Sequence, residues 1–519
     1  MEIKTETGYT KNIKCADVYT ESSAEYVLPD YLGDVRKILF TGAEARPSGR
    51  FAGAGEVEFS GIVVYTVVYL DSENDISSVE FTSEYDYAVK CSGERYKDSL
   101  SDTRVSNYQI RLIGPRKISA KSSLVGSARV CESDTLTVSG DALTFVDDVE
   151  TATRTLNVRK TLISSSAERE YAEEIANLDG AICDEVKVIY SEAEAGVDNV
   201  SLENDEVCVK GKLRMCAVIK NGDEPAYLAE KVVGYEEMIP FEDASDDMKF
   251  IPVITVTSLK STVNPEETGS SVVLSGIVEF SIVGEKNEEI EVVVDSYLKS
   301  CECDNSYEDF SYTSLSDVAS QHFSHTAELP RSEVESDSLR EVVFLSANPR
   351  VESVTSLEHG VKISGEMRYS GVASEISEDG KASYVMLKFS SPFAVNVNLD
   401  CQNIENLRFE TKVSASGAMA SMDAETIYAS SNLDVSVIAY EDKCERVLSA
   451  SIRREDMPID THGSKITVYY PMKNDTLFSV AKKYHTSPST IACNNSLSES
   501  VFAGGQNGAL TGVKKLIIF

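Results

Sequence analysis

The residues best suited to metal or redox chemistry form two short clusters. His322 and His325 lie three residues apart, and a single residue separates Cys301 from Cys303 in the acidic segment CECDNSYEDF. A zinc site needs three or four ligands, and no second histidine pair matches the first. The two thiols lack the C-x-x-C spacing of redox sites, and neighbouring acids raise a thiol pKa and lower its reactivity. We therefore expect no metal, no cofactor and two unpaired thiols.

Other catalytic signatures are missing as well. The sequence contains neither the GxxxxGK[ST] loop that cradles phosphates nor the GxSxG turn of a serine nucleophile. Acidic pairs such as Asp147-Asp148 and Asp246-Asp247 are expected as solvated turns in a chain with 85 acids, so no pair of glycosidase carboxylates can be singled out. We predict that the protein is not an enzyme.

Charge and hydropathy argue against two classes of partner. The 519 residues include 49 Lys+Arg and 85 Asp+Glu, which gives a net charge of −36. A field of that sign repels nucleic-acid phosphates and anionic lipid headgroups. The longest strongly apolar run, residues 61–70, is much shorter than the roughly 20 residues that span a bilayer. We expect no nucleic-acid partner and no membrane insertion.

The cysteines and the first residues bear on the compartment. Eleven cysteines are spread along the chain, and the opening MEIKTETGYT lacks the basic and apolar regions of a secretory signal. Reduced thiols in the cytoplasm are therefore expected rather than a disulfide framework.

Glycines in regular register reveal internal repeats. Gly61, Gly211 and Gly365 lie inside alternating apolar segments, 150 and 154 residues apart. A second series, Gly126, Gly276 and Gly417, has spacings of 150 and 141. A glycine inside a strand usually marks a bulge, a bend or a close backbone crossing, so these positions are interpreted as architectural.

Each repeat is predicted to be rich in strands. Short apolar segments at 35–40, 186–190 and 342–345 precede the glycine strands, and residues 207–219 alternate apolar and polar side chains as half-buried strands do. The best helical candidate is 164–178, which has serines that can cap it and Asp179-Gly180 as a stop. We predict three consecutive antiparallel β-domains of sandwich or barrel type.

The last 56 residues have a different character. Residues 466–497 read as strand, turn, helix, turn, helix, with Asp475 as a candidate N-cap and Ser487 before Pro488 as a second cap. The final KKLIIF could pair with ITVYY to complete a small βααβ module. Six lysines and two acids give residues 464–519 a net charge of +4, which leaves −40 for residues 1–463. A basic module on an acidic body can be steered toward an acidic partner.

This tail resembles a LysM domain over residues 464–519. The resemblance rests on Asn474 to Tyr484 (NDTLFSVAKKY), on Thr486-Ser487, on Asn494-Asn495 and on the closing GVKKLII. It implies a groove for glycans that contain N-acetylglucosamine. The implied groove residues lie on two sides: Asn474, Asp475, Thr476 and Leu477, and Asn494, Asn495, Ser496 and Leu497. The alternative is that Asp475 and Asn495 only cap and turn the chain.

The body is similar to SPOCS domains, which are β-domains associated with spore coats. The similarity rests on residues 61–81 and on GPRKISAK at 114–121. Repeated SPOCS domains followed by one LysM domain resemble SipL-type spore morphogenetic proteins. This resemblance implies a structural adaptor in the mother-cell cytoplasm, where it would help the coat to encase the forespore and would contact the coat-scaffold ATPase through the LysM end.

The predicted domain organisation follows from the repeats and the tail. Its parts are SPOCS-like domains at 1–162, 163–320 and 321–455, a linker at 456–463 and the LysM domain at 464–519. A second functional hypothesis is a cell-wall protein that binds peptidoglycan, although the missing export signal argues against it.

Overall fold

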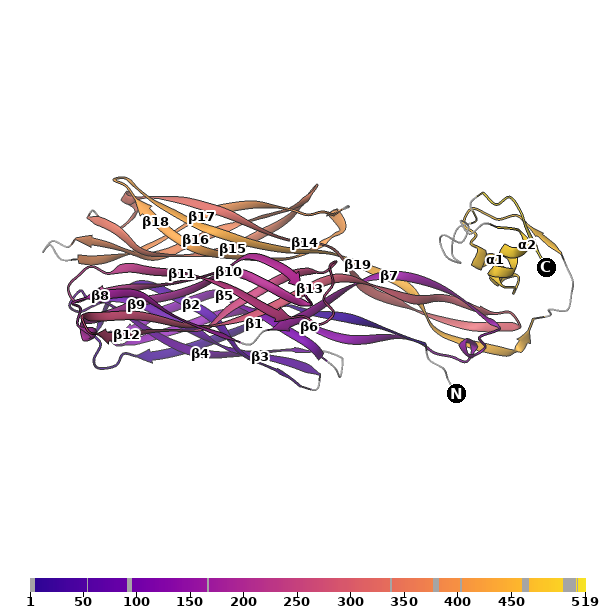
Figure 1. Cartoon of the computed structure of the whole chain (residues 1–519), viewed down its shortest axis with the longest axis horizontal. Coiled ribbons are helices and arrows are strands. Elements are labelled where there is room, and N and C mark those ends of the chain that lie inside the picture. The colour runs from indigo at the N-terminus through magenta and orange to yellow at the C-terminus, as the bar shows by residue number, and fades with distance from the viewer. Residues whose placement is uncertain are drawn as a thin grey trace.

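The architecture is seen in a computed structural model. It describes residues 5–53, 55–90, 96–165, 168–336, 338–376, 382–401, 404–459, 466–497, 510 and 512–519. These residues form long antiparallel strands and only two short α-helices, so the prediction of a mainly β chain is confirmed. The body is elongated, and a narrower bundle of strands leads from it toward the C-terminal tail (Figure 1).

Three units of the same design build the body. In each unit, three consecutive strands form one sheet, here called the meander sheet. The strand before the meander and the two strands after it form a second sheet, the long sheet, in which the last strand lies in the middle. The two sheets pack face to face around a hydrophobic core, as in a sandwich.

The strand bounds of the three units are as follows. Unit 1 has the meander β2 (Val35–Ala52), β3 (Glu56–Asp71) and β4 (Ile76–Lys90), and the long sheet β1 (Thr5–Val27), β6 (Lys117–Val138) and β5 (Tyr96–Gly114). Unit 2 has β9 (Val186–Glu203), β10 (Glu206–Asn221) and β11 (Tyr227–Pro240), and β8 (Arg169–Asp179), β13 (Gly269–Leu298) and β12 (Lys249–Glu266). Unit 3 has β15 (Leu339–Leu357), β16 (Gly360–Ile376) and β17 (Ala382–Asn398), and β14 (Cys301–Pro330), β19 (Thr426–Pro458) and β18 (Arg408–Met422).

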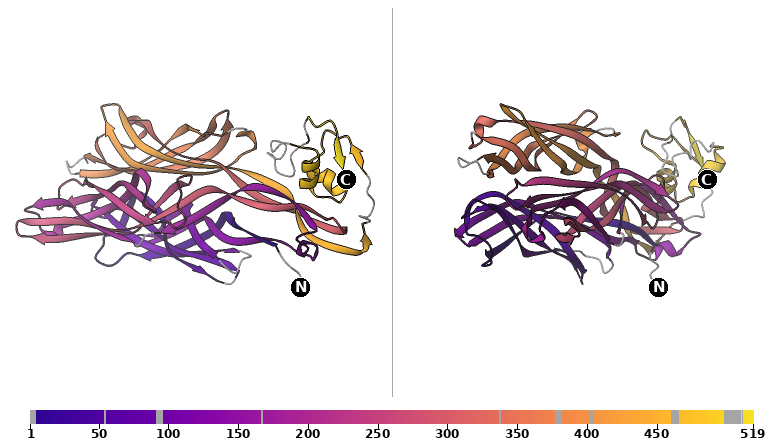
Figure 2. Two further views of the ribbon diagram at one scale, coloured as in Figure 1. Left: turned by 45° about the vertical axis from the view of Figure 1, so that its right-hand side comes forward. Right: turned by 60° about the vertical axis from the view of Figure 1, so that its left-hand side comes forward.

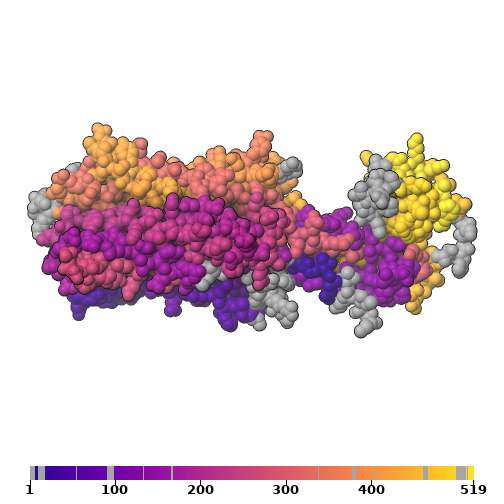
Figure 3. All heavy atoms as spheres, in the orientation of Figure 1, coloured from indigo at the N-terminus to yellow at the C-terminus, as the bar shows by residue number. Residues whose placement is uncertain are grey.

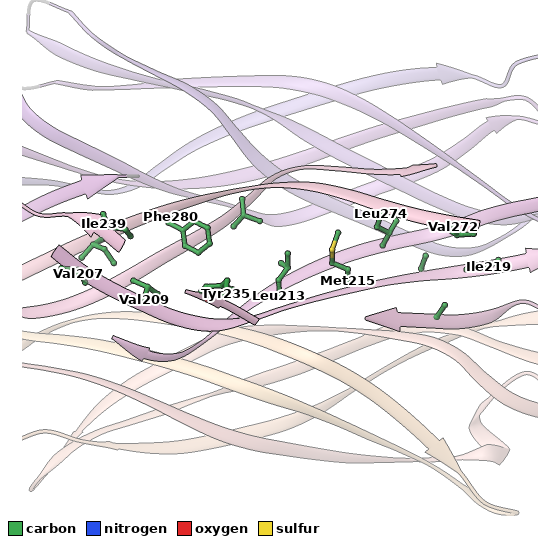
Figure 4. Close-up of a cluster of buried hydrophobic side chains, with 14 of the residues drawn as sticks. Val207, Val209, Leu213, Met215, Ile219, Tyr235, Ile239, Val272, Leu274 and Phe280 are labelled. Atoms are coloured by element: carbon green, nitrogen blue, oxygen red, sulfur yellow. The ribbon is translucent and has the colours of Figure 1, made fainter. Parts of the chain in front are cut away.

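The core of unit 2 shows how the alternation works. On β10, Val207, Val209, Leu213 and Met215 point between the sheets toward the side chains of β13 (Figure 4). The glycines of the first series lie at equivalent positions of the middle strand of each meander sheet. An aromatic ring from the neighbouring strand covers each of them. A Cβ on Gly211 would lie 2.1 Å from the carbonyl oxygen of Gly196, so only glycine fits there. The glycine and ring pairs are Gly61 with Tyr85, Gly211 with Tyr235, and Gly365 with Phe393.

The second glycine series holds in only two units. Gly126 and Gly276 lie on the middle strands β6 and β13, whereas Gly417 lies on β18, beside the middle strand β19. Gly417 has a φ of +61° within a register shift, so its glycine serves a local bulge. The spacing of 141 in place of 150 was the sign that Gly417 is not equivalent to the other two.

The predicted helix at 164–178 is wrong. Residues 169–178 form most of β8, which pairs with β13. A β-bulge at Ile175 changes which side chains face the core, so that Tyr171 lies inward before it and Leu178 after it. The resulting spacing of apolar residues by four and three imitates a helix, and pairing with a strand outweighs the local propensity.

The three units lie around a common axis, where equivalent residues of the three repeats meet. The short apolar segments of the repeats contribute Phe40, Tyr190 and Phe344, whose ring centroids lie 4.6 to 5.4 Å apart. Residues from all three meander sheets complete this cluster. The chain therefore places its three repeats around an axis as three subunits of a trimer would be placed.

A half-buried carboxyl, that of Glu192, lies near this axis and predicts a pH effect. Burial, and then the charge of Glu194, raise the pKa of Glu192 from 4.5 to about 8. Between these two values the unfolded chain releases the proton while the folded chain keeps it, so stability falls as the pH rises. Urea midpoints from pH 5 to 8 should fall less steeply for Glu192→Gln than for the wild type. The exposed change Glu21→Gln should leave the slope unaltered, and parallel slopes for all three proteins would contradict the prediction.

Three two-stranded ribbons extend from the body and form what we call the stalk. They are the start of β1 with the end of β6, the strand β7 (Val149–Ser165) with the end of β13, and the start of β14 with the end of β19. Figure 2 shows them leading together from the body to the tail. Their shared core contains Leu156, Ile290, Phe310 and Val447.

The stalk explains why the repeats have no clean borders in the sequence. The predicted boundary between residues 320 and 321 falls inside β14, and the one between 455 and 456 falls inside β19. The strand β14 runs from the stalk into unit 3, and β19 runs from unit 3 back into the stalk. The predicted linker at 456–463 overlaps the end of β19, and its residues 460–463 lie outside the described residues.

Four charged side chains, two of them buried, join the three units where the stalk meets the body. Arg159 of β7 makes two hydrogen bonds of 2.8 and 2.9 Å to Glu285 of β13 and one of 3.1 Å to Glu410 of β18. Arg129 of β6 contacts the same two carboxylates at 2.8 and 2.5 Å. Because Glu285 is fully buried, water cannot solvate its carboxylate. Each of these contacts takes the place of a hydrogen bond that water makes in the unfolded chain.

Candidate docking site of the C-terminal tail

The tail has a small fold of its own. Its described elements are β20 (Thr467–Tyr469), α1 (Leu477–Lys483), α2 (Pro488–Asn494) and β21 (Leu516–Ile518), and β20 pairs antiparallel with β21. The N-cap of α1 is Thr476, which accepts a 3.0 Å hydrogen bond from the Ser479 amide, so Asp475 is not the cap. Ser487 caps α2, and Pro488 occupies its first turn as predicted.

The first side of the predicted groove is mostly structural. Asp475 accepts hydrogen bonds from the Tyr469 hydroxyl at 2.6 Å and the Met472 amide at 2.7 Å, and these bonds lower its pKa. Thr476 caps α1, and Leu477 is buried in the core of the tail. Asn474 is the one residue of this side that is exposed.

The second side follows the same pattern. Asn495 donates 2.8 Å hydrogen bonds to the carbonyls of Ile491 and Ile517 and accepts one of 2.6 Å from the Ile517 amide. It therefore ties α2 to β21. Leu497 packs against the core, while Asn494 and Ser496 are exposed.

The largest contact of the tail is one that the sequence did not reveal. Phe478 of α1 is only 3% exposed, and its ring meets Tyr297 of β13 edge-on with centroids 5.2 Å apart. Ala152 of β7 belongs to the same cluster. The tail thus covers the end of the stalk, as the space-filling view shows (Figure 3).

Polar contacts surround this apolar centre. The Tyr297 hydroxyl donates a 2.6 Å hydrogen bond to the carbonyl of Thr486, and burial raises the pKa of Tyr297, which keeps the phenol protonated. Lys482 lies 2.6 and 2.7 Å from the two carboxylate oxygens of Asp295. His485 contacts the carbonyl of Leu298 at 3.0 Å and Glu302 at 3.4 Å. We call this contact the latch.

Little in the sequence could have found the latch. Its stalk residues follow a buried strand in VVVDSYLKS, where Asp295 and Tyr297 resemble any strand end. Its tail residues lie on α1 and in the turn that follows it, and Phe478 was assigned to the LysM pattern. The one usable signal was the opposite charge of tail and body, which Lys482 and Asp295 express locally.

The two clusters singled out for chemistry have structural surroundings. His322 is exposed and lies 2.6 Å from Asp434, whereas His325 is buried against the Tyr369 hydroxyl at 2.9 Å. They belong to opposite faces of β14. Burial, more than nearby acids, raises the pKa of Cys303. Cys301 accepts a 3.2 Å contact from Arg453.

The described residues were also searched for metal ligands and membrane-spanning helices. Nine cysteines among them are free, and they contain no group of three His, Cys, Asp or Glu that could hold a metal ion. In the same part of the chain, neither helix has the length and apolarity to cross a bilayer. Comparisons with protein-family models, curated proteins and solved structures give no match to this chain.

Proposed function

We propose that this chain is a non-enzymatic structural adaptor of endospore coat assembly. In this proposal it works in the mother-cell cytoplasm, at the forespore surface. The three units and the stalk act as a spacer, and the LysM-like tail docks to a coat-scaffold protein, of which the coat-scaffold ATPase is the candidate implied by resemblance.

The latch is the observation that carries the proposal. An adaptor must hold its binding module in a defined orientation, and Tyr297, Asp295 and Leu298 hold the tail by an aromatic contact, an ion pair and carbonyl bonds. The stalk itself is stiffened by a common core of three ribbons. The charge of the tail, opposite to that of the body, adds steering toward an acidic partner.

Deleting residues 464–519 tests the proposal. We expect the truncated protein to lose recruitment to the forespore and binding to the purified coat scaffold, because the docking module is gone. The body should keep the circular dichroism spectrum and the urea midpoint of its strands. Unchanged recruitment of a folded, truncated protein would refute the proposal.

A glycan-binding wall protein is the second candidate. It is favoured by the exposure of Asn474, Asn494 and Ser496, whose amides and hydroxyl could bond sugar groups. In the same experiment, the full chain is incubated with purified peptidoglycan. Retention that is lost in Asn474→Ala and kept in an exposed control, Thr490→Ala, would favour this second function over the adaptor.

A further inference from the structure

The two-stranded sheet of the tail has one covered edge. On the outer side of β21, the Asn495 side chain bonds the backbone of Ile517 as a further strand would, at 2.8 Å to its carbonyl and 2.6 Å from its N–H. Because the backbone of Ile517 faces Asn495, Ile517 and Val468 of β20 form a pair without hydrogen bonds between them. The N–H and C=O of Val468 therefore point to the outer edge of β20.

This outer edge of β20 is open. Within the part of the chain that the structure describes, no hydrogen bond uses the N–H or C=O of Val468. Ile466, Val468 and Tyr470 alternate along the strand and its flanks, and their side chains are 50% to 69% exposed. Pro471 follows, and because it has no N–H it limits the edge to residues 466–470, which we call the β20 edge. An open apolar edge of this kind is a template for pairing with another strand.

The β20 edge defines the strand that can pair with it. Such a strand needs an unpaired N–H and C=O at its centre and apolar side chains on one face. The β20 edge itself meets both conditions. When two copies run antiparallel about a two-fold axis at Val468, the two Val468 residues exchange both backbone hydrogen bonds. In this register Ile466 of each copy lies opposite Tyr470 of the other, so all the apolar side chains fall on one face of the joined sheet.

We propose that the β20 edge joins two copies of this chain, whose tails then form one four-stranded sheet in the order β21–β20–β20–β21. The contact is isologous and closes after two copies. A standard interface has roughly 20–30 residues on each side, so an edge of residues 466–470 gives a weak dimer, with half of the chains paired at about 100 μM. This inference stands apart from the proposed function, because an adaptor can dock to its scaffold without pairing with itself.

Sedimentation velocity of the full chain measures the dimer. The wild type should change from monomer to dimer as its concentration rises. Val468→Pro removes the outward N–H and leaves the pairing with β21, so it should weaken the dimer by at least about tenfold. Val468→Thr is the matched control. It keeps the N–H and a β-branched side chain, and it should dimerise within about threefold of the wild type.

A second control separates the edge from the apolar surface around it. Phe519 is 65% exposed, follows β21 and does not belong to the β20 edge. Phe519→Glu should therefore dimerise like the wild type. If Phe519→Glu abolishes the dimer and Val468→Pro does not, two apolar faces pack against each other, and the proposed strand pairing is wrong.

Disulfide crosslinking tests the register and keeps the inference testable if Val468→Pro unfolds the tail. In a full chain whose eleven native cysteines are replaced by serine or alanine, Val468→Cys should form a crosslinked dimer. The Cα atoms of such a pair lie about 5.5 Å apart, within the range of a disulfide. Ile466→Cys should crosslink only when it is mixed with Tyr470→Cys. A wild type that stays monomeric well above the expected concentration, or a dimer that Val468→Cys does not crosslink, would overturn the inference.

Discussion

Replacing Glu285 with glutamine is expected to destabilise the protein by about 3–5 kcal/mol, the range for breaking a buried ion pair by removing one partner. Glu285 accepts two hydrogen bonds from Arg159, one from Arg129 and one from Thr161. Burial alone would lower the pKa of Arg159, but the bonds and charges of Glu285 and Glu410 raise it. The guanidinium of Arg159 therefore stays charged. The neutral amide of a glutamine at position 285 would leave this buried positive charge without enough negative charge beside it.

The urea midpoint, followed by circular dichroism, measures this effect. Glu21→Gln is the matched control, because Glu21 pairs with Lys121 while both side chains are mostly exposed. Such pairs contribute about 0–1 kcal/mol. The four charges join strands of all three units, so we also expect the transition of Glu285→Gln to broaden as the units unfold separately. Equal midpoints for the two variants would show that the cluster does not hold the units together.

The repeated part of the fold could be predicted because its signals are local. Gly61, Gly211 and Gly365 each need space beside a neighbouring carbonyl, and a strict alternation surrounds them. The three apolar segments at 35–40, 186–190 and 342–345 were also found, but not their role. Their aromatic residues meet only after three separate units have folded, so no local pattern reveals the common axis.

The errors have equally specific causes. The bulge at Ile175 gives the apolar residues of a strand the spacing that is typical of a helix. Wherever a register shift occurs, the alternation of apolar and polar residues that identifies a strand is interrupted. The stalk was missed because strands of up to 33 residues, such as β19, are far longer than the usual strand. From the sequence alone, a domain boundary is therefore placed inside such a strand.

The groove implied by the resemblance and the latch involve different residues of the tail. The resemblance located the tail and the segment 474–477, yet Asp475, Thr476 and Asn495 are used by the fold of the tail. The latch joins residues about 190 positions apart, Asp295 and Lys482 among them. A single sequence without covariation holds no record of such a pair, so its discovery needed the three-dimensional arrangement.

Tyr297→Ala is expected to release the tail from the stalk. The change removes the ring that covers Phe478 and the hydroxyl that bonds the carbonyl of Thr486. Truncating a buried aromatic side chain to alanine costs about 3–5 kcal/mol. The partly exposed ion pair between Lys482 and Asp295 stabilises the docked tail by less than this. Tyr297→Phe keeps the ring and should retain most of the docking, since it loses one hydrogen bond worth about 1 kcal/mol.

Energy transfer between two dyes measures the release. Cys444 on the stalk and Cys493 on the tail are exposed and free, so they can carry the dyes once the other nine cysteines are replaced by serine or alanine. Tyr297→Ala should lower and broaden the transfer efficiency, while Tyr428→Ala, an exposed tyrosine of unit 3, should not change it. Transfer that is unchanged in Tyr297→Ala would mean that the linker alone positions the tail. If the tail is released as expected, the scaffold binding that we propose should weaken while the tail stays folded, because in this proposal the latch contributes orientation rather than the binding surface.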